Sequence, residues 1–167
     1  MTQDLEIRDP REITRGGIEA LKQLRALVTR RPEKEKLIIN GRQYLYFSDW
    51  QLLGAFFGIT TWVVDTREIN REVKSSDGNA TFIETIGFHA RAVAMKDGRE
   101  ISAAEAECLN DEPNWAKKPR FQLLSMAQTR ACAKALRNCL QWIVRLPQSE
   151  FAEEVAEELP PDNGRMF

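Results

Sequence analysis

The chain has 167 residues, 43% of them hydrophobic, a size and composition that favour one domain with one buried core. It has no apolar run of about 18 residues, and the charged start MTQDLEIRDPRE is unlike a signal peptide, so we expect a cytoplasmic protein without a membrane segment. Three cysteines without a C-x-x-C pair indicate neither a disulfide framework nor a zinc knuckle, and predict reduced thiols in the core.

The net charge of −1 conceals an asymmetry between two parts of the chain. Residues 147–167 carry six acidic side chains and one basic side chain, which gives −5. The remaining 146 residues hold the other 23 basic and 19 acidic side chains, which gives +4. We therefore predict a single domain over residues 1–146 and an acidic mobile tail over residues 147–167, and the basic body permits contact with a polyanion.

Three elements are expected in the first third of the chain. Apolar residues recur at helical spacing over residues 11–29, which predicts a first helix. The pair Asn40-Gly41 between short extended segments predicts a β-hairpin closed by a type I′ turn. The sequence DWQLLGAFFG predicts a short helix with Ser48 as its N-cap and Gly58 at its end.

The segment from 60 to 108 is rich in β-branched and aromatic residues and is divided by two Asp-Gly pairs. It predicts an antiparallel three-stranded meander over about 60–74, 80–95 and 99–108. In the middle strand, one face should pack against a helix and the other should face water. The packed face comprises Phe82, Ile86, Phe88, Ala90, Ala92 and Ala94, and the wet face comprises Thr85, His89 and Arg91.

A long helix is predicted over residues 120–146, ended by Pro147. At about 100° per residue, the side expected to face the sheet carries Phe121, Ser125, Cys132, Leu136, Cys139, Ile143 and Leu146. The opposite side carries a basic stripe of Arg130, Lys134 and Arg137. No acidic residue lies between residues 119 and 147, which favours an external anionic partner over an ordinary solvated face, the alternative interpretation.

Within this helix, SMAQTRACAKALRNCLQWIV resembles the DNA-binding helix of the Rad fifty-two type of single-strand annealing proteins, in which a threonine precedes a Lys/Arg-Ala-Leu-Arg core. The resemblance implies that Lys134 and Arg137 contact the DNA backbone, although Ala133 stands where that family commonly has a second basic residue. The order of hairpin, short helix, meander and long helix is similar to that family's β-β-β-α unit. The segment from AEAEC through DEPNW is similar to phage and prophage proteins grouped with the Rad fifty-two, ERF and RecT annealing proteins.

Further residues complete the predicted nucleic-acid contacts. The cations are Lys117, Lys118 and Arg120 around the start of the last helix, and Arg67, Arg71 and Arg91 on the strands. For each of them taken singly, a solvated surface charge is the alternative. Trp115 is placed to stack on a base, or else packs onto the core. Packing in the core is also expected of Trp50, Trp62 and Trp142.

A metal-dependent nuclease is the second function considered. Glu84, Glu105 and Glu107 supply the carboxylates that a Mg²⁺ site needs, although scattered surface charge is the plainer interpretation. Because His89 is the only histidine, a His-based zinc site is excluded. Neither glycine-rich phosphate-loop pattern is present, so ATP-driven strand exchange is disfavoured.

The sequence thus predicts a non-enzymatic protein that binds and anneals single-stranded DNA in recombination, without ATP, metal or cofactor. Its expected partners are single-stranded DNA and copies of itself, because the resemblance implies rings or filaments in which short basic tracts join. A third hypothesis is a phage regulatory module that binds a protein partner through the acidic tail.

Overall fold

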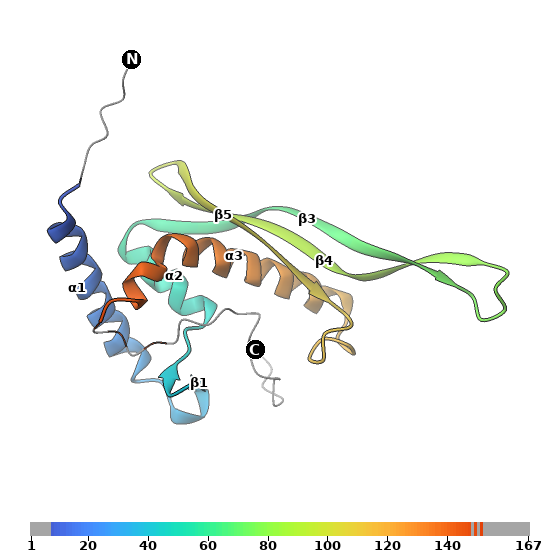
Figure 1. The fold of residues 1–167 in the computed structure, drawn as a ribbon, viewed down its shortest axis with the longest axis horizontal. Coiled ribbons are helices and arrows are strands. Elements are labelled where there is room, and N and C mark those ends of the chain that lie inside the picture. Colours follow the sequence, from blue (N-terminus) through green and yellow to red (C-terminus); the bar gives the residue numbers. More distant parts are fainter. Residues whose placement is uncertain (1–7, 148, 150, 152–167) are drawn as a thin grey trace, which may run out of the picture.

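A computed structural model describes residues 8–147, 149 and 151 of the chain. Its helices are α1 (Pro10–Val28), the 3₁₀ helix η1 (Glu33–Glu35), α2 (Phe47–Phe56) and α3 (Arg120–Val144). Its strands are β1 (Ile38–Ile39), β2 (Arg42–Gln43), β3 (Ile59–Lys74), β4 (Thr81–Lys96) and β5 (Arg99–Leu109). This is the α+β order predicted from the sequence, and Figure 1 shows it as a ribbon. The acidic tail that the sequence predicts falls, from residue 152 on, outside the described residues.

Turn residues close two of the hairpins as predicted. Asn40 and Gly41 join β1 to β2 with φ angles of 51° and 78°, and Asp97 and Gly98 join β4 to β5 with φ angles of 50° and 73°. Two consecutive positive φ angles are the mark of a type I′ turn, whose twist matches that of the strands. Asparagine, aspartate and glycine tolerate this region better than other residues, which is why local sequence sufficed to place both turns.

Helix α2 begins two residues earlier than the sequence suggested, so Ser48 is not its N-cap. Tyr46 occupies that position, and its N–H donates to the carboxylate of Asp49 at 2.8 Å. The same carboxylate accepts two hydrogen bonds from the guanidinium of Arg31, at 2.6 and 3.1 Å. The buried carboxylate of Asp49 therefore accepts hydrogen bonds both from the backbone of Tyr46 and from Arg31, and these bonds favour a helix that begins at Phe47. The end of the helix near Gly58, with a φ of 67°, is as predicted.

The sheet has the order β3-β4-β5, and every neighbouring pair is antiparallel. β5 ends opposite Gly87, so residues 81–86 of β4 pair only with β3. The two strands and their turn therefore continue beyond the body as a two-stranded arm, residues 70–86, which projects at one side in Figure 1. An isolated two-stranded ribbon is only marginally stable in water, so the arm depends on its attachment to the sheet.

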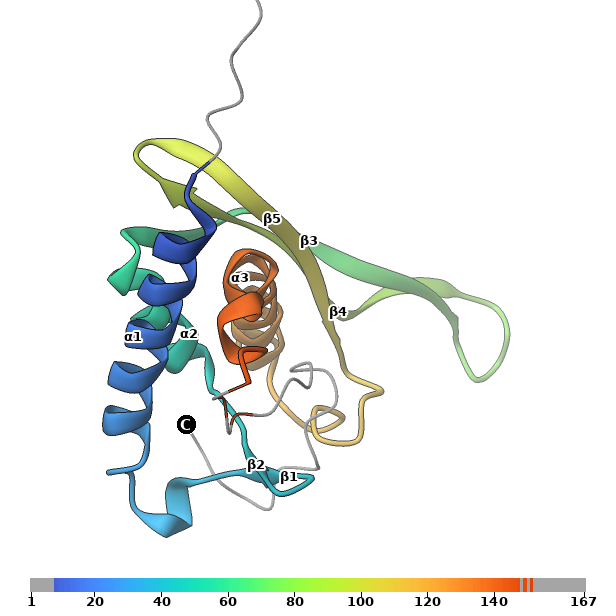
Figure 2. The same cartoon turned by 60° about the vertical axis from the view of Figure 1, so that its left-hand side comes forward.

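Helix α3 lies between the sheet and the other two helices, as Figure 2 shows from a second direction. Ala90, Ala92 and Ala94 of β4 are fully buried against it, and so are Ala127, Ala131 and Ala135 of α3 itself. Small side chains on both surfaces let the helix axis approach the sheet closely. The far side of α3 packs against α2, where Leu136 approaches Gly54.

The expected burial faces are wrong at several positions, and one of them is Ser125 of α3, which was expected to face the sheet and is exposed. Phe82, on the arm, is 52% exposed, and Phe121, in the first turn of α3, is 68% exposed. Both lie where a strand or helix extends past the core, so periodicity alone assigned them to a face that nothing covers. His89 is only 5% exposed although the sequence placed it on the wet face, because it lies on the central strand between the side chains of β3 and β5.

The cysteines are free thiols inside the fold, as predicted. Cys108 and Cys132 are buried and Cys139 is half-buried. Burial raises the pKa of the Cys108 thiol to about 12, because the thiolate loses its hydration there.

Within the described part of the chain, no helix is long and apolar enough to cross a bilayer.

Candidate nucleic-acid interface

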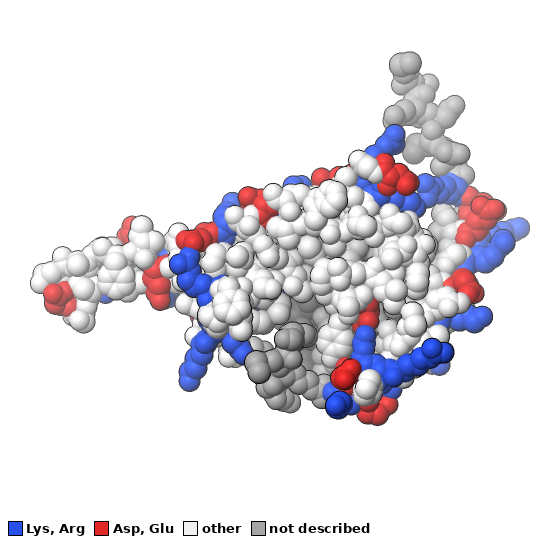
Figure 3. Space-filling view, turned by 180° about the vertical axis from the view of Figure 1, so that it is seen from behind, with Lys and Arg blue, Asp and Glu red and all other residues white. Residues whose placement is uncertain are grey.

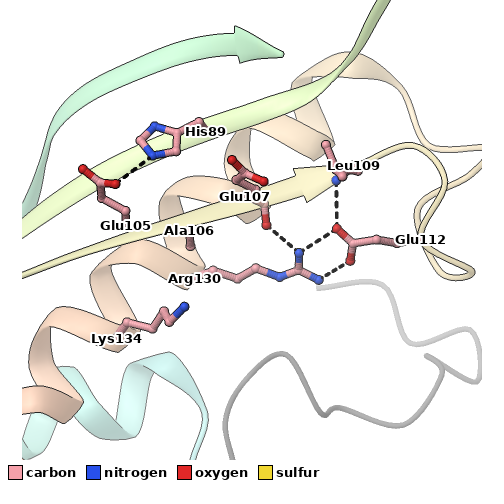
Figure 4. A pocket seen from close by; sticks show the side chains of 8 residues that line it. All are labelled: His89, Glu105, Ala106, Glu107, Leu109, Glu112, Arg130 and Lys134. Carbon is pink, nitrogen blue, oxygen red and sulfur yellow. Dashed lines mark hydrogen bonds and ion pairs between the residues drawn. The ribbon is translucent and has the colours of Figure 1, made fainter. Parts of the chain in front are cut away.

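The α3 basic face, defined here as Arg130, Lys134 and Arg137, is not the solvent-facing stripe that the sequence predicts. Arg130 reaches the outer edge of β5, where Nη1 donates to the carbonyl oxygen of Glu107 at 2.7 Å. The same guanidinium forms two hydrogen bonds with Glu112, at 2.8 and 2.5 Å, which Figure 4 shows as dashed lines. The carboxylate of Glu112 also accepts from the backbone N–H of Leu109 at 2.8 Å. Arg130 therefore ties α3 to the loop that follows β5.

Arg137 is buried, with 8% of its surface exposed. Its guanidinium carbon lies 5.9 Å from the centre of the Trp50 ring, so it packs against α2 as a cation–π partner. The predicted solvent-facing stripe is therefore wrong at this position. The physical reason is that α3 is central in the fold, with the sheet on one side and α2 and the segment before it on the other.

Lys134 lies between these two anchored arginines and lines a pocket of about 480 Å³ at the edge of β5 (Figure 4). The pocket is lined by His89, Glu105, Ala106, Glu107, Leu109, Glu112, Arg130 and Lys134. Three carboxylates and two cations line the pocket, so an anion is attracted to some parts of the pocket and repelled from others. The cations occupy the α3 side, and that side is the part able to approach a phosphate.

A second group of predicted cations gathers where α3 begins. Arg120 is exposed and forms an ion pair with Glu68 of β3, and its guanidinium carbon lies 5.8 Å from the centre of the Phe88 ring. Lys117 and Lys118 are exposed in the loop just before it. These contacts bring the start of α3 against the base of the arm.

The arm side of the same region carries two more of the predicted residues. Arg71 is exposed and forms an ion pair with Glu84 at 2.8 Å. Arg67 is exposed on β3, next to Glu68 and opposite His89 in the register. We call the group of Arg67, Arg71, Lys117, Lys118 and Arg120 the cationic end. Figure 3 shows Lys and Arg side chains near the base of the projecting arm, interspersed with acidic ones.

Two predicted contacts belong neither to the α3 basic face nor to the cationic end. Arg91 is half-buried on β4 and makes a long contact of 3.5 Å with Glu100. Trp115 is partly buried and packs against the hydrophobic core, which was the alternative to a stacking role. Among the other tryptophans, Trp50 is buried as expected, whereas Trp62 is 55% exposed and so does not serve mainly in packing.

The three carboxylates considered for a nuclease are not brought together. Glu84 pairs with Arg71 on the arm, beyond the end of β5. Glu105 contacts Nε2 of His89 at 3.3 Å, and Glu107 lines the pocket beside it. Among residues 8–147, 149 and 151, no group of three or more His, Cys, Asp or Glu side chains could hold a metal ion. This geometry gives the predicted trio no common cation site.

The chain was compared with known proteins at the level of sequence and of structure. No family model matches it, and neither a curated protein nor a solved structure does. The resemblance to single-strand annealing proteins therefore stays a prediction, carried by the residues of α3.

Proposed function

We propose that this protein binds single-stranded DNA and anneals complementary strands without ATP, with phosphates held at the cationic end and along the α3 side of the pocket at Lys134. The observation that carries the proposal is that the ion pair of Arg120 with Glu68 brings the start of α3, with Lys117 and Lys118 just before it, beside the stretch of β3 that carries Arg67 and Arg71. These residues lie up to 53 positions apart in the sequence, from Arg67 to Arg120, and the fold brings them to one end of the body.

The ion pairs at the cationic end do not prevent phosphate binding. Arg120 and Arg71 have side chains that are 62% and 57% exposed, and their partners Glu68 and Glu84 are 46% and 42% exposed. Exposed pairs of this kind contribute at most about 1 kcal/mol to stability. A phosphate backbone that releases counterions upon contact can therefore compete with them.

Exposed apolar side chains support the assembly that annealing requires. Phe82 and Ile83 on the arm are 52% and 72% exposed, and Phe121 at the start of α3 is 68% exposed. Large apolar side chains in water favour contact with another surface, either a second copy of the chain or unstacked bases. Many copies, in a ring or filament, would join short cationic ends into a longer track for a strand.

The direct test is the binding of a fluorescently labelled single strand, followed by anisotropy over a range of salt concentrations, without ATP or Mg²⁺. The logarithm of the binding constant should fall linearly with the logarithm of the salt concentration. The triple variant K117A/K118A/R120A should bind about tenfold more weakly and show a slope smaller by about two, since each phosphate contact in a single strand contributes about 0.7. Arg99→Ala, an exposed cation at the β4–β5 turn, is the matched control and should bind like the parent.

Annealing is measured separately, by the pairing of two complementary labelled strands in the absence of ATP. The parent protein should accelerate pairing and the triple variant should not. Light scattering should show multimers under the same conditions. The absence of binding at low salt would contradict the proposal, and Mg²⁺-dependent shortening of the labelled strand would replace it with a nuclease.

A further inference from the structure

The sheet has an outer face, which points away from α3. Ala90 and Ala92 of β4 are buried against α3, so the residues that alternate with them, His89 and Arg91, lie on the opposite face. Residues that are paired across two antiparallel strands share a face. Arg67 of β3 is the partner of His89, so it also belongs to the outer face.

A β-bulge places Phe82 of the arm on this outer face as well. The register of β3 with β4 shifts just after Ile69, where β4 contains one extra residue. Beyond the shift, Arg71 pairs with Glu84 and Val73 pairs with Phe82. Because β3 stays regular there, its alternate residues keep to one face, and Arg71 and Val73 follow Ile69 on the outer side. Phe82 therefore lies beside Arg71 on the outer face.

Trp62 lies at the other end of the outer face. Its neighbour Val63 packs against the hydrophobic core, so Trp62 points to the opposite side. Trp62 and Phe82 are both more than half exposed. The stretch of β3 from Trp62 to Val73, the partner of Phe82, spans about 36 Å at about 3.3 Å per residue. One continuous surface thus has an exposed aromatic side chain at each end.

Arginines lie between the two aromatic side chains. On β3 and β4, this part of the outer face carries Arg67, Arg71 and Arg91 against Asp65 and Glu84. Arg67 is exposed and forms no ion pair within the described part of the chain. The pairs of Arg71 and Arg91 are exposed to water and therefore weak. The further acidic residues of the outer face belong to β5, so β3 and β4 form its basic half.

We propose that Trp62 and Phe82 stack on bases of the bound single strand while the arginines between them hold its phosphates, an inference that rests on the proposed function. Aromatic side chains interspersed with cations are the pattern by which proteins bind single strands without reading their sequence. A second copy of the chain would fit this surface poorly, because the core of a protein–protein interface is depleted in charged residues. Here charged side chains separate the two aromatic ones.

Stacking is tested with two strands that share the same phosphate backbone. One is an oligonucleotide of mixed sequence, and the other has abasic sites over its central part, so that phosphates remain where bases are absent. Phe82→Ala and Trp62→Ala should each weaken binding to the first strand about tenfold. Neither should weaken binding to the second strand by more than about twofold. The triple variant K117A/K118A/R120A should weaken both strands alike, because the phosphates are unchanged.

Ile83 provides the matched control for Phe82. It is the next residue on the arm, is more exposed than Phe82 and points to the opposite face. Ile83→Ala should therefore bind both strands like the parent. Phe82→Trp keeps an aromatic ring and should bind like the parent, whereas Phe82→Leu keeps only apolar volume and should bind as weakly as Phe82→Ala. Circular dichroism and light scattering of each variant should show the fold and the assembly of the parent.

The outcomes separate stacking from the proposed function. If Phe82→Ala and Trp62→Ala weaken the two strands equally, or bind both like the parent, stacking is wrong and the proposed function stands. If Phe82→Ala breaks up the multimers that the parent forms, Phe82 contacts a second copy instead, and the inference is overturned. If the parent binds neither strand at low salt, the proposed function fails and stacking fails with it.

Discussion

The side chains of Arg130 and Glu112 face one another in a bidentate pair, with hydrogen bonds of 2.8 and 2.5 Å from the guanidinium to the carboxylate. Their side chains are 12% and 29% exposed, so the pair is partly shielded from water. Paired with the contact of Arg130 to the carbonyl of Glu107, it fastens α3, β5 and the following loop at one point. Arginine is suited to this role because its planar head presents parallel donors.

We expect Glu112→Ala to lower the free energy of unfolding by about 1–3 kcal/mol, because Arg130 loses its carboxylate while partly buried. Glu100→Ala is the matched control: its contact with Arg91 is 3.5 Å long and exposed, so its removal should change stability by less than about 0.5 kcal/mol. Urea unfolding followed by circular dichroism measures both. Equal stabilities for the two variants would show that the bidentate pair does not hold the loop.

The same carboxylate predicts a dependence on pH. Burial raises the pKa of Glu112, but hydrogen bonds from Arg130 and from the N–H of Leu109 outweigh it, so the pKa lies below its ordinary value of 4.5. A depressed pKa means that the stability contributed by Glu112 is complete above pH 4.5 and is lost as the pH falls from there through the folded pKa. Between these limits, the free energy of unfolding of Glu112→Gln should change less steeply with pH than that of the parent. Unfolding curves at several pH values from 3 to 7 measure the two slopes, and parallel slopes would assign the acid sensitivity to other groups.

Local sequence was sufficient for the fold and insufficient for the site. The turns at Asn40-Gly41 and Asp97-Gly98 depend on residues that adopt positive φ angles by themselves, so they were predictable. The partners of Arg130 and Arg137 come from other elements, and an absence of acidic residues within α3 says nothing about Glu112 in the preceding loop or Trp50 in α2. From the sequence, one side of α3 was expected to face solvent. Because α3 is central in the fold, that expectation misses both contacts.

Two members of the α3 basic face, Lys134 and Arg137, should differ in experiment. Arg137→Ala should lower the free energy of unfolding by about 1–3 kcal/mol, because a buried side chain stacked on Trp50 is removed. Lys134→Ala, at a half-buried position on the pocket rim, should cost less than about 1 kcal/mol yet weaken binding to single strands. Thermal unfolding and anisotropy titrations of the two variants give the comparison. A pattern in which Lys134→Ala destabilises more than Arg137→Ala would contradict the burial described for α3.

The thiols should be unreactive until the fold opens. Burial raises the pKa of Cys108, Cys132 and Cys139, so little thiolate is present at pH 8 and reagents have poor access to it. Iodoacetamide should therefore modify all three slowly in the native protein and rapidly in urea, which intact-mass measurements can follow. A fast reaction at Cys139, the least buried of the three, would show local opening at the end of α3.

The packing of α2 on α3 can be tested by a pair of identical substitutions at two helical glycines. An alanine at Gly16 in α1 would meet no atom within 4 Å, whereas an alanine at Gly54 in α2 would place its Cβ 2.9 Å from the carbonyl oxygen of Ile59 and 3.3 Å from a methyl of Leu136. Both changes gain up to about 1 kcal/mol from helix propensity. Gly16→Ala should therefore stabilise the protein, and Gly54→Ala should destabilise it by about 1–3 kcal/mol, since backbone must move to admit the added carbon. Urea unfolding of the two variants measures the difference, and a gain in stability at both positions would show that α2 does not approach β3 and α3 as closely as described.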